Sequence, residues 1–225
     1  TLDLFSQHLS DSGFGIGIVP IREDGTCLWG CIDIDIYPID LPSIQTNLSR
    51  NNLPFIVSRS KSGGAHLLLF MSEPVEASLM RRKLFEISAG LGFSQGEVFP
   101  KQEKLLLERG DIGNAFNLPY YKASASTRYA LKENGEAASL EEFLDAVDKR
   151  RLTEEQLTQL RIESVDSLED APPCIQYLCT QGFPKGTRNN GLFNIGVYLH
   201  KAYPDNWEHE LEEFNRKYMD PPLPS

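Results

Sequence analysis

Two aspartates, Asp33 and Asp35, stand two positions apart in a run where isoleucine and aspartate alternate. Such alternation is typical of a β-strand, on which residues two apart point to the same face. We therefore expect Ile32, Ile34 and Ile36 on the opposite face, in the core. Solvated aspartates on an edge strand are the simpler interpretation, but aspartate is rare in strands and two neighbouring carboxylates repel each other. The pair predicts a divalent-metal site, because Mg²⁺ and Mn²⁺ prefer oxygen ligands.

A second group of polar residues occupies one short stretch: Arg59, Ser60, Lys61, Ser62, Gly63, Gly64, Ala65 and His66. Its cations and hydroxyls can bind phosphate oxygens, and its glycines allow a ligand to approach the backbone closely. These are the elements of a triphosphate site. A simple glycine turn followed by a structural histidine would explain the same residues, and the nearby aspartate pair is what favours phosphate binding.

A third carboxylate is needed if two metal ions are to be held with open coordination positions. Glu97 is the candidate, because it begins a short apolar segment that ends at Pro100. Lys101 and Gln102 follow it and could face a phosphate or a template. The competing acids in this part of the chain are Glu103, Glu108 and Asp111.

Charge is distributed unevenly along the 225 residues, whose formal net charge is −10. Residues 57–132 carry 11 basic and 7 acidic side chains, so the segment that follows the aspartate pair is cationic. A cationic zone beside an acidic metal site suits a polyphosphate or a nucleic-acid backbone.

The cysteines and the apolar runs indicate in which compartment the protein acts and whether it binds zinc. The four cysteines, without secretory features, indicate a reducing environment, and the spacings C-x3-C and C-x4-C do not favour zinc. No apolar run approaches the length of a membrane span, and the first residues resemble neither a signal peptide nor an initiator methionine. We expect a cytoplasmic protein without membrane contacts, and these first residues are compatible with a fragment of a longer polypeptide.

The elements that must position these residues alternate between strand and helix. The patterns predict strands at 14–19, 31–37, 55–60, 65–70, 97–99 and 115–119, and helices at 41–51 and 74–91. A glycine turn joins the strands at 55–60 and 65–70. This mixture predicts an α+β or α/β fold.

The second half of the chain predicts helices. Ser139 with Glu142, and Thr153 with Gln156, are capping-box patterns for two helices in an acidic stretch. Asp170-Ala171-Pro172-Pro173 interrupts the chain. We therefore expect three parts: a catalytic core at 1–135, an acidic helical connector at 136–171, and a small helical domain at 172–225.

In order along the chain, these motifs resemble those of the archaeo-eukaryotic primase, or primase-polymerase, superfamily. The resemblance covers about residues 14–130 and is closest to the branch of phages, plasmids, conflict systems and CRISPR-associated proteins. It rests on Asp33-Ile34-Asp35, Ser60 to His66, Glu97 to Gln102, and Gly113 to Pro119. The segment Gly186 to Asn190, with Leu192-Phe193-Asn194, resembles the helical C-terminal domain of many such primases.

The resemblance implies an α+β core with an RRM-like mixed or antiparallel sheet and flanking helices, followed by a small all-helical subdomain. It implies Mg²⁺ or Mn²⁺ held by Asp33, Asp35 and Glu97, the last at a place where relatives often have aspartate. The residues implied to bind the incoming nucleotide are Arg59, Ser60, Lys61, Ser62, Gly63, His66 and Lys101. Those implied to bind the template or the initiating nucleotide are Gln102, Asn114, Arg188 and Asn189. For Arg188 and Asn189, helix capping and an interhelical contact are the alternative.

The implied activity is templated nucleotidyl transfer that synthesises and extends primers on single-stranded DNA from NTPs or dNTPs. It would serve replication of a phage, plasmid or related element in a bacterial, archaeal or phage-infected cell, with a fused or associated helicase as an expected partner. A non-catalytic replication or nucleic-acid-binding module on the same sheet is the alternative. A metal-dependent nucleotide-sugar transferase is a further one, since its Asp-x-Asp motif also binds a metal diphosphate.

Overall fold

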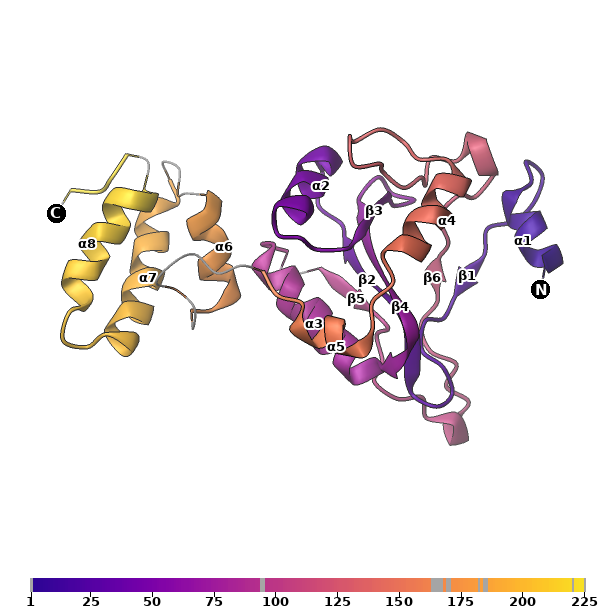
Figure 1. Cartoon of the computed structure of the whole chain (residues 1–225), viewed down its shortest axis with the longest axis horizontal. Coiled ribbons are helices and arrows are strands. Elements are labelled where there is room, and N and C mark those ends of the chain that lie inside the picture. The colour runs from indigo at the N-terminus through magenta and orange to yellow at the C-terminus, as the bar shows by residue number, and fades with distance from the viewer. Residues whose placement is uncertain are drawn as a thin grey trace. The chain divides into compact units, whose positions relative to one another are not determined.

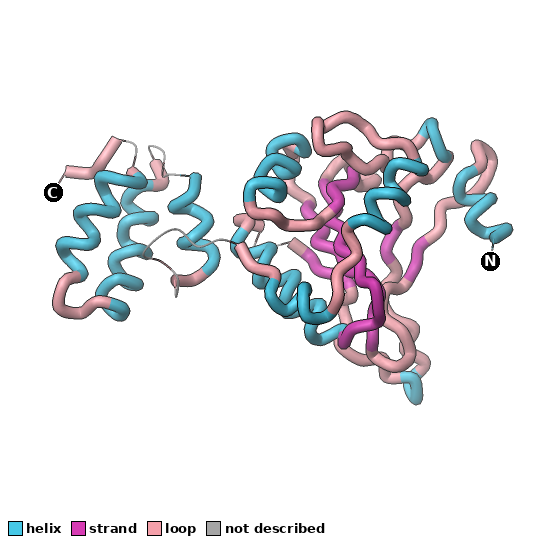
Figure 2. The backbone as a smooth tube through the Cα atoms, viewed as in Figure 1, coloured by secondary structure: helices cyan, strands magenta, loops and turns pink. Residues whose placement is uncertain are grey.

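The computed structural model describes residues 2–93, 96–162, 168, 171–181, 183, 186–219 and 221–224. The chain forms two compact units, the first from Thr1–Glu86 and Gln95–Arg161 and the second from Ile87–Ser94 and Ile162–Ser225. Strands lie in the first unit, whereas the described elements C-terminal to residue 162 are helices, as Figure 2 shows.

The first unit is built on a four-stranded antiparallel sheet with the order β3-β4-β2-β5. Its elements are β2 (Thr26–Ile34), α2 (Leu41–Arg50), β3 (Ile56–Arg59), β4 (Ala65–Glu76), α3 (Ala77–Gly90), of which the residues from Ile87 onward belong to the second unit, and β5 (Glu97–Phe99). This β-α-β-β-α-β sequence with that strand order is the split βαβ arrangement of RRM-like sheets. The predicted α+β fold class is confirmed.

The two faces of the sheet are covered by different elements, as Figure 1 shows with α2 and α3 on one side and α4 (Leu140–Lys149) on the other. On the first face, α3 lies close to β2, because a Cβ added to Gly30 would be 2.7 Å from Leu84 and 2.8 Å from Met80. The other face packs into a cluster that includes Cys31, Leu68 and, from α4, Phe143. Asp33 belongs to this second face, since it is two residues from Cys31.

Short elements complete the first unit. They are α1 (Leu2–Leu9), β1 (Gly17–Ile18), the 3₁₀ helix η1 (Leu107–Arg109), β6 (Phe116–Asn117), the 3₁₀ helix η2 (Ala123–Ala125) and α5 (Glu154–Gln159). Strands β1 and β6 pair antiparallel in a second sheet. The predicted capping boxes of Ser139 with Glu142 and of Thr153 with Gln156 begin α4 and α5, as expected. The segment predicted as an acidic connector therefore contains α4, whose Phe143 and Val147 are buried against the sheet.

The second unit contains α6 (Pro173–Gln181), α7 (Arg188–Ala202) and α8 (Trp207–Tyr218). Its core includes Ile175, Ile195, Leu199 and Phe214, so the expected helical C-terminal part is confirmed. None of the helices in the described part of the chain is long and apolar enough to cross a membrane. The proposed division of the chain into three parts stays a prediction.

The end of strand β2 and the start of helix α3 differ from the predicted bounds. Strand β2 stops at Ile34, which pairs with Ala65, because the chain before Ala65 turns away in a loop and offers no further partner. Ile36 is consequently 53% exposed, and its prediction as a core residue was wrong. The predicted helix at 74–91 begins at Ala77, since β4 continues to Glu76 by pairing with Thr26 after an irregular stretch that accommodates Pro74.

Candidate active site

Three predicted site residues meet through the register of the sheet. Asp33 on β2 is the direct partner of His66 on β4, and on its other side it is the partner of Glu97 on β5. Directly opposed residues in antiparallel strands point to the same face. The register therefore brings together, at one end of the sheet, an aspartate, a histidine and a glutamate that lie far apart in the sequence.

Asp33 carries a buried oxygen that lacks a hydrogen bond. The Nε2 atom of His66 is 3.4 Å from Oδ1 of Asp33, and the side chains are 9% and 20% exposed. This approach does not have hydrogen-bond geometry, and among the described residues Oδ1 has no hydrogen-bond partner. A buried carboxylate oxygen without a partner is costly, so this atom is suited to accept a ligand.

His66 is fixed by the core as well as by its strand. Its ring lies 4.5 Å from the ring of Phe116, centroid to centroid, at an interplanar angle of 55°. Phe116 in turn contacts Trp29 and Phe99 edge-on. The imidazole is thus packed on an aromatic cluster, with its Nε2 directed toward Asp33. Sequence reasoning did not include Phe116 in the site, although it lies in a segment that carried the resemblance.

Asp35 lies just beyond the end of β2 and is exposed. Its Oδ1 accepts hydrogen bonds from the Tyr37 hydroxyl at 2.8 Å and from the Ser62 Oγ at 3.3 Å. Although a hydrogen bond with Ser62 lowers it, the pKa of Tyr37 lies above its ordinary value, because the bond to Asp35 and nearby carboxylate charge raise it. Tyr37 was not a predicted site residue.

The predicted phosphate-binding stretch forms a tight loop between β3 and β4. The Ser60 amide donates to the Gly64 carbonyl at 2.9 Å, the Gly64 amide donates to Ser60 Oγ at 2.9 Å, and Ser60 Oγ lies 3.0 Å from Ser62 Oγ. A Cβ at Gly64 would be 2.3 Å from the carbonyl oxygen of Ile34. Glycine is required there, and its absent side chain lets the loop rest against the end of β2.

The two cations of this stretch differ in their contacts. Arg59 ends β3, and its Nη1 donates to the carbonyl of Thr127 at 3.1 Å. Gly63, at φ +95°, lies beneath the guanidinium, where an added Cβ would be 3.2 Å from Nη2 of Arg59. Lys61 is exposed at the tip of the loop. A ligand at this loop would find Lys61 accessible and Arg59 anchored to the backbone.

Glu97 is exposed, with 61% of its side chain accessible to solvent. Its Oε2 is 2.6 Å from Nζ of Lys101, which also lies 5.0 Å from the centroid of the Phe99 ring. Beyond them, the side chains of Gln102 and Asn114 are hydrogen-bonded to each other. The predicted nucleotide and template residues of this segment are thus adjacent to Glu97, although Lys101 is paired with it.

Arg81 of α3 holds this segment in place. Its Nη1 donates to the carbonyl oxygens of Pro100, at 2.8 Å, and Lys101. Its neighbour Lys83 also turns inward, with Nζ 3.1 Å from the carbonyl of Leu160. Of the basic triplet of α3, Arg82 is exposed. Two of these cations are therefore used to fix backbone segments, a role that the sequence did not reveal.

Oxygen donors, but no assembled metal centre, are present at this end of the sheet. Across the described ranges, no three histidine, cysteine, aspartate or glutamate side chains form a group that could hold a metal ion. The unpaired Oδ1 of Asp33 and the neighbouring carboxylate of Asp35 are nevertheless hard oxygen ligands of the kind that Mg²⁺ and Mn²⁺ bind. Burial raises the pKa of Cys27 to about 12 and holds that of Cys31 well above its ordinary value, so these thiols pack as neutral side chains.

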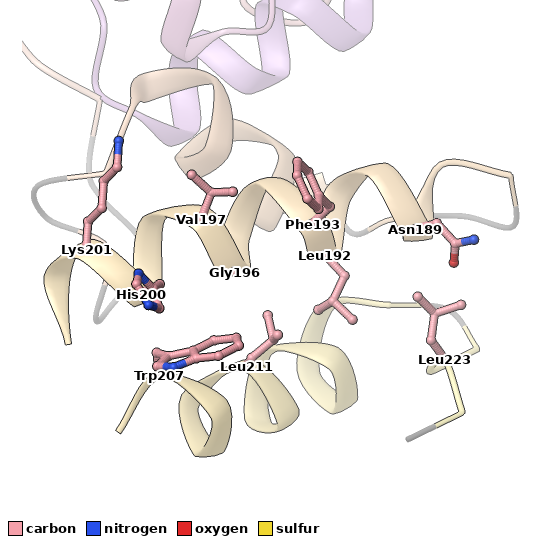
Figure 3. Close-up of a pocket in the computed structure, with 10 residues that line it drawn as sticks. All are labelled: Asn189, Leu192, Phe193, Gly196, Val197, His200, Lys201, Trp207, Leu211 and Leu223. Atoms are coloured by element: carbon pink, nitrogen blue, oxygen red, sulfur yellow. The ribbon is translucent and has the colours of Figure 1, made fainter. Parts of the chain in front are cut away.

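Arg188 and Asn189 belong to the second unit. Nη1 of Arg188 donates to the carbonyl of Pro221. Asn189 lines a cavity of about 530 Å³ along α7 and α8, where Trp207 faces His200 with ring centroids 5.4 Å apart (Figure 3). The remaining lining residues are Leu192, Phe193, Gly196, Val197, Lys201, Leu211 and Leu223. The template role of Arg188 and Asn189 stays a prediction.

Comparison with known families gives one match. The family model for the archaeo-eukaryotic primase domain of TOTE conflict systems matches residues 1–160. No curated protein matches the chain. The match includes the whole end of the sheet where Asp33, His66 and Glu97 are paired.

Proposed function

The chain belongs to the archaeo-eukaryotic primase family of TOTE conflict systems, and from this premise we propose that it is a DNA-dependent primase-polymerase. The family is one of nucleotidyltransferases that act on nucleotides and nucleic acid. The proposed reaction is templated nucleotidyl transfer, which starts primers and extends them on single-stranded DNA. NTPs and dNTPs are both proposed substrates.

One observation supports this proposal most strongly: the pairing of Asp33 with His66 and Glu97 at a sheet end that also adjoins the Ser60 to Gly64 loop. Phosphoryl transfer asks a protein chiefly to position reactants and to offset negative charge. Carboxylates beside a loop of hydroxyls, glycines and cations meet that need. A binding module without catalysis has no use for a buried carboxylate oxygen that lacks a partner.

The role that we propose for each side chain follows from its environment. Asp33 and Asp35 would hold Mg²⁺ or Mn²⁺, with Glu97 as the third acid. Such ions, when bound, supply positive charge against the attacking and leaving oxygens. Lys61 and Ser62 would contact the triphosphate from the loop, with the backbone of Gly63 close to it. Arg59 and His66, both anchored by the fold, would keep their positions while the nucleotide binds.

Template contacts are proposed for Gln102 and Asn114, whose mutual hydrogen bond places two amide side chains beside Lys101. Amides of this kind can bind base edges or sugar hydroxyls. Lys101 would bind a phosphate of the ligand after its ion pair with Glu97 breaks. Arg188 and Asn189 are proposed to assist with the template or the initiating nucleotide, and a helicase is a proposed partner.

The test is nucleotide incorporation by a double variant. With Asp33→Ala and Asp35→Ala together, we expect primer synthesis and extension on single-stranded DNA to fall below detection, because two of the proposed metal ligands are absent. NTPs and dNTPs are offered separately, each with Mg²⁺ and with Mn²⁺, and incorporation of labelled nucleotide is measured.

The matched control is Asp145→Ala with Asp148→Ala, which removes two exposed aspartates of α4. This control should incorporate nucleotide at the wild-type rate. Circular dichroism should show both variants folded. Incorporation by the Asp33/Asp35 variant at the wild-type rate would refute the proposal and favour a non-catalytic nucleic-acid-binding module.

A further inference from the structure

Tyr37 contacts the proposed site, although it was not a predicted site residue. The residue follows Asp35 by two positions and is 53% exposed, so the core does not depend on its side chain. Its hydroxyl nevertheless makes a short hydrogen bond of 2.8 Å to Oδ1 of Asp35. A hydrogen bond from a neutral hydroxyl to a carboxylate is stronger than one between neutral groups.

The hydrogen bonds to Asp35 converge on one of its two oxygens. Tyr37 and Ser62 both donate to Oδ1, and no described residue donates to Oδ2. A carboxylate has lone pairs on both oxygens, so holding one of them leaves the other free for a ligand. The two hydroxyls therefore orient a carboxylate that lies outside the strand and that the sheet itself does not fix.

The two donors differ in how firmly the fold holds them. Ser62 belongs to the loop that Gly64 seats against Ile34, and its Oγ lies 3.0 Å from that of the buried Ser60. Its bond to Asp35 is long, at 3.3 Å, and Ser62 is itself a proposed phosphate ligand. Tyr37 has the shorter bond and no proposed contact with the nucleotide. Tyr37 is thus the donor that can stay on Asp35 while the loop binds a substrate.

We propose that Tyr37 is a positioning residue that holds Oδ1 of Asp35 and so presents Oδ2 to the divalent ion. This inference rests on the proposed role of Asp35 as a metal ligand. Outer hydrogen bonds that orient ligating groups commonly change metal affinity by about 10- to 100-fold when they are removed. Tyr37 would therefore set how tightly the site binds its ion, while the nucleotide contacts stay with the loop.

The test is Mn²⁺ binding by the whole chain, measured by electron paramagnetic resonance of free Mn²⁺ without nucleotide. Tyr37→Phe keeps the ring and removes the hydroxyl. We expect this variant to raise the Mn²⁺ dissociation constant by about tenfold. The matched control is Tyr121→Phe, which removes a hydroxyl that donates to the carbonyl of Gly13 at 3.0 Å. This control should bind Mn²⁺ as the wild type does.

Two further measurements separate positioning from a loss of structure and from failure of the proposed function. The midpoint of thermal unfolding should be the same for Tyr37→Phe and the wild type. Asp35→Asn should lose most of the Mn²⁺ binding. Equal Mn²⁺ affinity of Tyr37→Phe and the wild type, with Asp35→Asn impaired, would overturn the role of Tyr37 alone. Wild-type Mn²⁺ binding that is absent, or indifferent to Asp35→Asn, would overturn this role together with the proposed metal site.

Discussion

The carboxylate of Asp33 and those of Asp35 and Glu97 lie at the same end of one sheet but in different surroundings. Asp33 is on a central strand, 20% exposed, with a buried oxygen that accepts no hydrogen bond from a described residue, although His66 Nε2 lies 3.4 Å away. Asp35 is outside the strand and accepts two hydroxyl bonds, and Glu97 is paired with Lys101. The inner acid is fixed and unsatisfied, whereas the outer acids are satisfied and able to exchange partners.

This difference has a physical cause. Pairing on both sides fixes the backbone of Asp33, and the Oδ1 atom of its side chain is buried without a hydrogen bond from a described residue. Unsatisfied buried groups cost stability and persist where the surrounding structure over-determines them, often at functional sites. The outer acids incur little such cost, because they are exposed to solvent and are bound by the hydroxyls of Tyr37 and Ser62 or by Lys101. A fixed inner ligand with adjustable outer ones can bind an ion without rebuilding the sheet.

The largest expected effect comes from the inner acid. Asp33→Asn keeps the shape of the side chain and removes its charge. Nucleotide incorporation should fall at least about a hundredfold, since a metal ligand supports several kcal/mol of transition-state stabilisation. The free energy of unfolding should rise by about 1 kcal/mol, because a partly buried carboxylate, whose Oδ1 accepts no hydrogen bond from a described residue, is replaced by a neutral amide. Urea denaturation and incorporation rates measure the two quantities.

Asp35→Asn is the control for this comparison. It should also lose activity, but its free energy of unfolding should match that of the wild type, since Asp35 is exposed. If Asp33→Asn proved less stable than the wild type, Asp33 would have a stabilising partner, and the contrast between inner and outer acids would fail.

A smaller effect is expected at Glu97. Glu97→Gln should lower incorporation by about tenfold, because the third acid is weakened while the inner ligand stays. Stability should change little, since an exposed ion pair such as that with Lys101 contributes about 0–1 kcal/mol. The measurement is the incorporation rate as a function of Mg²⁺ concentration. An unchanged rate would move the third-acid role to Glu103, Glu108 or Asp111.

The smallest effect is expected at an exposed acid–lysine pair on another part of the unit. Glu142 caps α4 and is paired with Lys132 at 2.7 Å, and hydrogen bonds from Lys132 and from the Ser139 amide hold the pKa of Glu142 below its ordinary value of 4.5. A lowered folded-state pKa adds stability above the ordinary value, and this stability is lost as pH falls through the folded-state pKa.

Glu142→Gln should therefore be less stable than the wild type at neutral pH, and the difference should shrink below about pH 4.5. Unfolding by urea over a series of pH values measures it. Incorporation at neutral pH should be unchanged, in contrast to Glu97→Gln. A difference that stayed constant through the acid range would contradict the proposed contribution of the Glu142 charge.

Local patterns predicted the elements best. The strand at Glu97–Phe99 ends where expected, because Pro100 follows it, and the boxes at Ser139 and Thr153 begin their helices, because their signals lie within four residues. The predicted start of α3 was wrong, because Val75 and Glu76 of its first predicted turn pair with β2 as the end of β4. The contacts of Arg81 could not be predicted from the sequence, because its partners, the carbonyls of Pro100 and Lys101, are distant in sequence.

The sequence by itself determined which chemistry the chain could offer: two acids at strand spacing, a loop of hydroxyls and glycines, and a glutamate ahead of Lys101. Tertiary structure decided how these groups differ. Register placed Asp33 between His66 and Glu97 and left its Oδ1 unpaired, and the end of β2 placed Asp35 within reach of Tyr37. Burial and hydrogen bonding depend on neighbours that only folding brings into contact, so residue types and spacing could not distinguish the fixed acid from the adjustable ones.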